Sequence, residues 1–254
     1  MVDWLKVDTM ATLQVAQLRV PEGQTLEIVD VTWPKLKKIL HDLGDKRNTR
    51  LAYSDGVLSI MAPFPEHEIY KVCIGECVRV LLDELEMDYT SLGSTLFKHE
   101  QSQTIVQPAD CFYLDQVEAM ARKLRLDLQV DPPPTLAIEV DVLSKSQLAA
   151  YRGLGVPELW RYAGGQLSIA RLQSGDYVQV EASSVFPGWP IKEAVEVYVK
   201  KARTINQRKA KQYFRLWVLR RIESLKAEPA VEETTTDPVV EEQTADPVVE
   251  GKNG

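Results

Sequence analysis

Cysteine is scarce in this sequence, and the positions of the three cysteines exclude the usual cysteine-based architectures. Cys73 and Cys77 lie one helical turn apart, with no further Cys or His at zinc-ligand spacing, and Cys111 is distant from both. A disulfide framework is therefore not expected, and this usage is typical of a reducing compartment. We interpret Cys73 and Cys77 as core residues.

Long apolar runs are also lacking. No run approaches the roughly 18 residues that a membrane-spanning helix needs. The first eight residues, M-V-D-W-L-K-V-D, contain acids where a signal peptide would carry a basic segment. From these absences we expect a soluble cytoplasmic protein with no membrane partner.

Most of the chain has no excess of either charge, although the formal net charge is −7 at pH 7. Residues 227–254 contain eight acids and one base, Lys252, which leaves 29 acids and 29 bases in residues 1–226. This acidic tail repeats T-T-D-P-V-V-E and T-A-D-P-V-V-E, a composition that predicts disorder. The summed charge argues neither for nor against an anionic partner, because steering depends on where the charges lie.

The stretch T-L-A-I-E-V-D-V-L-S, residues 135–144, predicts a buried strand that carries two carboxylates. The strand period of two places Glu139 and Asp141 on one face and the branched residues on the other. Two neighbouring acids repel each other, so their burial requires a cation, a basic partner or water, and a divalent metal would meet that need. The alternative is a solvated strand face.

A long helix is predicted from about Glu66 to Glu86. Its core stripe consists of Ile69, Cys73, Cys77, Val80, Leu81 and Leu85. Glu66 and His67 fall within the arc of that stripe, so an acid and an imidazole enter the domain at the first helical turn. Alternatively, Glu66 complements the helix dipole and His67 is a half-buried side chain with its hydrogen bonds satisfied.

Turn and cap signals predict the neighbouring elements. Residues 32–44 indicate a short capped helix, and Asp55-Gly56 indicates a β-hairpin between alternating runs. The run Q-T-I-V-Q-P-A-D-C-F-Y-L predicts a strand in which Asp110 lies between apolar neighbours. Residues 115–130 predict an exposed helical connection, which D-P-P-P at 131–134 ends.

The C-terminal half continues with a helix, a strand and a hairpin, and then becomes helical again. Ser144 or Ser146 is the expected cap of a helix that stops at Gly155, and a strand over 158–162 follows.

Two further helices are expected to meet near Thr204 or Asn206. Between Lys200 and Lys226 there are ten Lys or Arg residues and a single acid, Glu223. Such a run is either a solvated helix face or a surface that lies along phosphates.

The order of these elements, with acids on the helix and on successive strands, resembles the PD-(D/E)XK nuclease core. The resemblance is closest to the bacterial Uma-two family of restriction-endonuclease-like proteins and covers about residues 45–220. It is carried by D-G, I-M-A-P and P-E-H-E at 55–68, Q-P-A-D-C-F-Y at 107–113, P-P-P-T-L-A-I-E-V-D at 132–141 and L-G-V-P-E-L-W-R-Y at 154–162.

The resemblance implies a mixed α/β fold with a restriction-endonuclease-like core in the order α-β-β-β-α-β. An N-terminal hairpin would precede this core, and C-terminal helices would follow it. The expected division of the chain is an N-terminal arm and helix at 1–44, the core at 45–190, basic helices at 191–226 and the acidic tail at 227–254.

The resemblance also implies a site. Asp110 and Glu139 match the metal-binding acids of the family, we expect Asp141 to join them, and Glu66 or His67 matches its first-helix position. Such oxygen ligands would hold Mg²⁺, with Mn²⁺ as a substitute, and the metal would polarise a phosphate and help generate hydroxide.

One position departs from the superfamily pattern. Two residues beyond Glu139 the wider motif has Lys, whereas this chain has Asp141. Lys145 is the nearest candidate to replace it as a catalytic residue, because its long stem could reach back. Alternatively, Lys145 is an exposed residue at a helix start.

The function implied is a Mg²⁺-dependent endonuclease that hydrolyses phosphodiester bonds of DNA, with RNA as the other candidate substrate. The first alternative is a catalytically inactive nuclease-fold protein that binds nucleic acid or a protein partner. The second is a structural protein with a solvated acidic face. Association into a homodimer is one of the expectations.

Overall fold

The computed structural model describes residues 18–44, 48–141 and 143–227, and these residues form two β-sheets and six α-helices. The predictions for the arm in residues 1–17 and for the acidic tail beyond Ala227 lie outside them. The mixed α/β fold expected from the sequence is confirmed. No helix in the described ranges combines the length and the apolar composition that a membrane crossing requires.

The first sheet is antiparallel and has five strands. Its order is β1 (Thr25–Ile28), β3 (Val57–Met61), β2 (Arg50–Ser54), β6 (Thr104–Val106) and β5 (Phe97–His99). The predicted hairpin joins β2 to β3, and both Asp55 and Gly56 have the positive φ that a two-residue hairpin turn needs, 52° and 79°. The predicted capped helix is α1 (Trp33–Leu43), whose buried face packs on this sheet.

The second sheet has six strands and contains the core that the family resemblance predicts. Its order is β11 (Asp176–Val180), β10 (Gln166–Gln173), β9 (Glu158–Ala163), β8 (Leu136–Val140), β7 (Asp110–Tyr113) and β4 (Thr90–Ser91). β8 and β9 are parallel, and the other pairs are antiparallel. With α2 (Pro65–Glu84) and α4 (Lys145–Leu154), these strands give the succession α2, β4, β7, β8, α4, β9, which is the predicted order.

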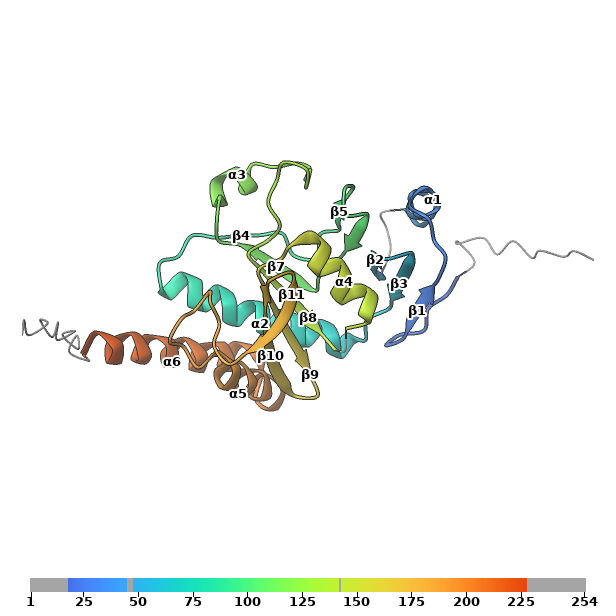
Figure 1. The fold of residues 1–254 in the computed structure, drawn as a ribbon. Coiled ribbons are helices and arrows are strands. Elements are labelled where there is room, and N and C mark those ends of the chain that lie inside the picture. Colours follow the sequence, from blue (N-terminus) through green and yellow to red (C-terminus); the bar gives the residue numbers. More distant parts are fainter. Residues whose placement is uncertain (1–17, 45–47, 142, 228–254) are drawn as a thin grey trace, which may run out of the picture.

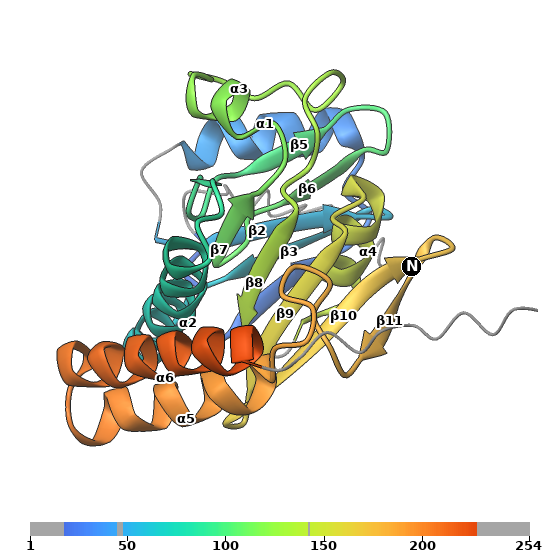
Figure 2. The same cartoon turned by 90° about the vertical axis from the view of Figure 1, so that its left-hand side faces the viewer.

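Helices cover this sheet on both faces (Figures 1 and 2). α2, α5 (Ile191–Thr204) and α6 (Gln207–Ala227) share one core with the sheet. Cys73 and Cys77, predicted to be core residues, are buried free thiols in this core. α4 packs on the other face and shares a second core with residues of the five-stranded sheet. α4 begins at the Ser144 cap, which accepts a hydrogen bond from the Gln147 backbone N–H, and ends at Gly155 with φ of 77°.

Two segments differ from the sequence prediction. The run expected as one strand around Asp110 forms two strands, β6 and β7, which belong to different sheets and are separated at Pro108. Proline has no backbone N–H to donate to a strand neighbour, so the ladder breaks there. The helical connection expected over 115–130 contains only the short α3 (Val117–Ala121).

Candidate functional site

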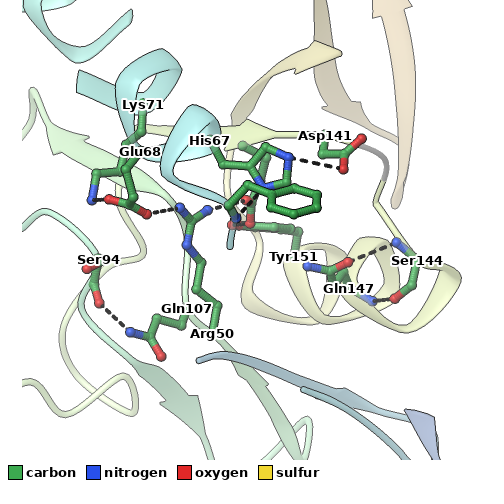
Figure 3. Close-up of polar contacts among 12 residues, drawn as sticks. Arg50, His67, Glu68, Lys71, Ser94, Gln107, Asp141, Ser144, Gln147 and Tyr151 are labelled. Carbon is green, nitrogen blue, oxygen red and sulfur yellow. Dashed lines mark hydrogen bonds and ion pairs between the residues drawn. The ribbon is translucent and has the colours of Figure 1, made fainter. Parts of the chain in front are cut away.

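Glu139 is the centre of the candidate site. Its side chain lies on β8 and is 1% exposed. The Tyr151 hydroxyl on α4 donates a 2.5 Å hydrogen bond to Oε1, and Arg50 Nη1 on β2 lies 3.6 Å from Oε2. Residues from both sheets and from α4 therefore meet at one buried carboxyl group. Figure 3 labels two of them, Arg50 and Tyr151.

Arg50 connects this carboxyl group to the surface. Its Nη2 donates a 2.7 Å hydrogen bond to Glu68 on α2, and Glu68 also pairs with Lys71. The Arg50 side chain is almost completely buried, and its Nη1 has no hydrogen bond to any described residue. We call these five residues, Lys71, Glu68, Arg50, Glu139 and Tyr151, the Arg50 network (Figure 3).

The protonation of Glu139 is sensitive to pH near neutrality. Burial raises the pKa of its carboxyl group to about 7, while the charge of Arg50 and the hydrogen bond from Tyr151 act in the opposite direction. Burial likewise raises the pKa of the Tyr151 phenol well above its usual value, so Tyr151 acts as a donor. For Glu68, burial is outweighed by Lys71 and Arg50, and its pKa is lowered.

Asp110 lies on β7 with different partners. Arg79 Nη2 on α2 is 3.0 Å from Oδ2, and the Ser91 hydroxyl and the Cys111 backbone N–H donate to Oδ1. α2 passes very close to this carboxylate, because a Cβ on Gly75 would stand 2.5 Å from Oδ2. Asp110 is therefore a buried member of an ion pair between β7 and α2.

The strand register separates the two acids that were expected to share a metal. Asp110 pairs with Ile138, so both side chains face α2, whereas the neighbouring Glu139 faces α4. The strand pairing ends at Asp110, and the preceding residue, Ala109, donates its backbone N–H to the Ile138 carbonyl and belongs to the core shared with α2.

Asp141 does not share a site with Glu139 either. Its φ of 79° ends the extended strand, so the alternation that would align residues 139 and 141 no longer applies. Its Oδ2 lies 3.4 Å from Nε2 of His67, whose Nδ1 accepts a hydrogen bond from the Phe64 backbone N–H. His67 and Asp141 thus form a second polar pair, drawn beside the Arg50 network in Figure 3.

Within the described residues, neither Glu66 nor Lys145, which the resemblance suggested for catalysis, makes a hydrogen bond or an ion pair with Glu139. Glu66 accepts a 2.6 Å hydrogen bond from Tyr70 and pairs with Arg203 on α5 at 3.0 Å. Lys145 is the exposed first residue of α4 and has no ion pair within the described part of the chain. The sequence analysis did not identify Arg50 or Tyr151 as site residues. The periodic pattern indicates only that Arg50 is in a strand and that Tyr151 is on the apolar face of a helix.

Restriction-endonuclease-like families generally use a divalent metal, so the acids of this site should be able to converge on one ion. Within residues 18–44, 48–141 and 143–227 no group of three or more His, Cys, Asp or Glu side chains could hold a metal ion. Asp110 and Glu139 face opposite sides of the sheet, and each has an arginine as counter-ion. These residues, as they are arranged, do not fit Mg²⁺, which needs several oxygen ligands at one point.

A groove lies beside the His67 and Asp141 pair. It consists of two adjoining hollows of about 280 Å³ and 460 Å³ that share Tyr70 and Tyr162, and we call it the tyrosine groove. The two rings are 5.0 Å apart, and Arg203 lies over the Tyr70 ring at 5.5 Å. Lys200 and Arg203 line its α5 end. Glu66, Asp141 and Glu196 line it as well, so the groove combines aromatic rings with side chains of both charges.

Comparison with known proteins agrees with the family resemblance. The model of the Uma2 family, described as "Putative restriction endonuclease", matches residues 33–213. A solved structure from Anabaena variabilis, described as a putative nuclease belonging to DUF820, is similar over 64% of this chain and 92% of that chain, with 12% sequence identity and a TM-score of 0.41. Among curated proteins, none matches the chain.

Proposed function

Because the chain belongs to the Uma2 family of restriction-endonuclease-like proteins, we propose that it binds nucleic acid through the tyrosine groove without hydrolysing it. The absence of hydrolysis is proposed because of the contacts that Glu139 makes. Its carboxyl group is held by Tyr151 and Arg50, and the expected second acid, Asp110, pairs with Arg79 on the other face of the sheet. The Arg50 guanidinium group already supplies the positive charge that a bound metal would bring to Glu139.

Nucleic-acid binding is supported by the chemistry of the groove and of α5. Aromatic side chains stack on unpaired bases, and neighbouring Lys and Arg neutralise phosphates. The basic side chains at the α5 end are Lys200 and Arg203, which line the groove, and the exposed Lys201 beside them. DNA is the first candidate, and RNA is tested alongside it.

The family match favours a competing proposal, a Mg²⁺-dependent endonuclease. Cleavage would need Asp110 or Asp141 to move to Glu139, and Lys145 to approach the same point. That rearrangement would break the buried ion pair between Asp110 and Arg79, or separate Asp141 from His67. Loss of a buried charge partner is unfavourable, and we therefore prefer the binding proposal.

Fluorescence anisotropy with labelled single-stranded DNA, duplex DNA and RNA tests the binding half. Lys200→Glu reverses a charge that lines the groove and should weaken binding and reduce the slope of log affinity against log salt by about one. Lys38→Glu is the matched control, since Lys38 is an exposed lysine on α1, and Figures 1 and 2 show α1 at the opposite end of the fold from α5. Equal weakening by both variants would reject the groove as the binding surface.

A further inference from the structure

A second groove lies between α5 and α6 and is mainly apolar. It has a volume of about 330 Å³, and its lining includes Val197, Lys201, Tyr213, Phe214 and Trp217. Val197 is 53% exposed and Tyr213 is 55% exposed, although both are large apolar or aromatic side chains. We call it the α5–α6 groove.

Basic residues lie in and next to this groove. Lys201 lines it and lies 5.1 Å from the Tyr213 ring centroid, with Lys200 as its neighbour on α5. Arg208 and Lys209 are exposed at the start of α6. Glu193 is the acid among the lining residues. An occupant should therefore combine small apolar side chains with flanking acids.

The acidic tail of this chain has that composition twice. Each of its repeats contains a Val-Val pair between acids, as Asp237-Pro238-Val239-Val240-Glu241 and Asp246-Pro247-Val248-Val249-Glu250. We propose that one of these Val-Val pairs occupies the α5–α6 groove of the same molecule. Its flanking carboxylates would then lie beside the lysines of α5 and the basic start of α6.

The length of the chain permits this contact. The tail follows α6 directly at Ala227, and Trp217 lies ten residues before that end, about 15 Å along the helix. The twelve residues from Glu228 to Val239 can span up to about 40 Å when extended. Both repeats can therefore reach back to the groove. The contact is intramolecular, so its effective concentration is high.

The docked tail would also regulate the neighbouring surface. Val197 lines both the α5–α6 groove and the tyrosine groove, so the two surfaces adjoin on α5. Acids bound beside Lys200 and Lys201 would compete with phosphates for the same cations. The docking itself does not depend on nucleic-acid binding, and it can be tested without any nucleic acid.

Photo-crosslinking in the full chain tests the proposal. A benzoylphenylalanine replaces Val239 in one variant and Val248 in another, and each is irradiated in a mixture of isotopically light and heavy chains before the adducts are mapped by mass spectrometry. We expect adducts with α5 and α6 residues of the same chain in at least one of the two variants. Adducts between light and heavy chains would show that a second copy supplies the occupant, and adducts spread over the whole surface would show no docking. Either result would overturn the proposal.

Two matched variants distinguish groove docking from chance proximity. Val197→Glu places a like charge in the groove and should remove most of the adduct. Val178→Glu changes a valine of similar exposure on β11, 46% against 53%, and should leave the yield unchanged. Both sites are exposed, so the fold should tolerate the substitutions, which circular dichroism checks. An adduct yield that Val197→Glu does not reduce would also overturn the proposal.

Discussion

Asp110 and Glu139 lie on adjacent antiparallel strands, yet their side chains face opposite sides of the six-stranded sheet. Asp110 pairs with Arg79 of α2, and Glu139 meets Tyr151 of α4 and Arg50 of β2. The two acids are therefore charge partners of different arginines. This separation leads to the predictions that follow.

The first prediction concerns the pH dependence of stability. The folded pKa of Glu139 is raised to about 7, above its ordinary value of 4.5, so the folded protein binds this proton more tightly than the unfolded chain. Its contribution to stability is present below about pH 4.5 and is lost as pH rises towards 7, by at most about 1.4 kcal/mol per pH unit. Glu139→Gln should remove that loss.

Urea denaturation at a series of pH values measures this effect as a difference between wild type and variant. The other titrating groups are common to both proteins and cancel in the difference. Glu181→Gln, at an exposed acid on the surface, is the control and should follow wild type. If the difference in free energy of unfolding between wild type and Glu139→Gln stays constant from pH 4.5 to 7, Glu139 does not titrate in that range.

The second prediction concerns the hydroxyl group of Tyr151. Tyr151→Phe leaves a buried carboxyl group without its 2.5 Å hydrogen bond and should reduce the free energy of unfolding by about 1.5–3 kcal/mol. Because that bond lowers the pKa of Glu139, its loss should raise this pKa further and make the variant most unstable above neutral pH. Tyr177→Phe removes a hydrogen bond to the Val156 carbonyl and should show no such pH dependence.

The third prediction concerns the contact between α2 and Asp110. An alanine normally stabilises a helix interior relative to glycine by about 1 kcal/mol. Gly75→Ala should instead destabilise this protein by about 1–3 kcal/mol, because the new Cβ would stand 2.5 Å from Asp110 Oδ2 and 2.6 Å from Arg79 Nη1. Thermal denaturation gives the sign directly. A double variant with Asp110→Ala should be more stable than the sum of the two single changes predicts, and strict additivity would contradict the contact.

Much of the fold could be predicted because its signals are local. The Asp55-Gly56 hairpin, the Ser144 cap and the stripe of α2 depend on residues within a few positions of one another, and the structure confirms them. Local signals could not predict that residues 104–114 divide between two sheets. Alternating apolar residues predict a strand equally well for either sheet, and the choice depends on distant strand partners.

The site was less predictable for the same reason. Arg50, Glu139 and Tyr151 come from three elements, so their convergence is a property of the tertiary fold. The strand period predicted Glu139 as a buried acid, which the structure confirms. The resemblance indicated a metal as the compensating charge. The structure supplies an arginine instead. A strand register, which sequence does not determine, decides that Asp110 lies on the other face.

The measurement that tests the account most directly is a cleavage assay at saturating binding. Wild type, Glu139→Ala, Asp110→Asn and Lys145→Ala are incubated with supercoiled plasmid, single-stranded DNA and RNA, with Mg²⁺ and with Mn²⁺, and products are separated by electrophoresis. Isothermal titration of Mn²⁺ into the same proteins runs in parallel. We predict bound but intact nucleic acid in every sample, and no Mn²⁺ binding that depends jointly on Asp110 and Glu139. Metal-dependent nicking by wild type that Glu139→Ala abolishes would contradict the account.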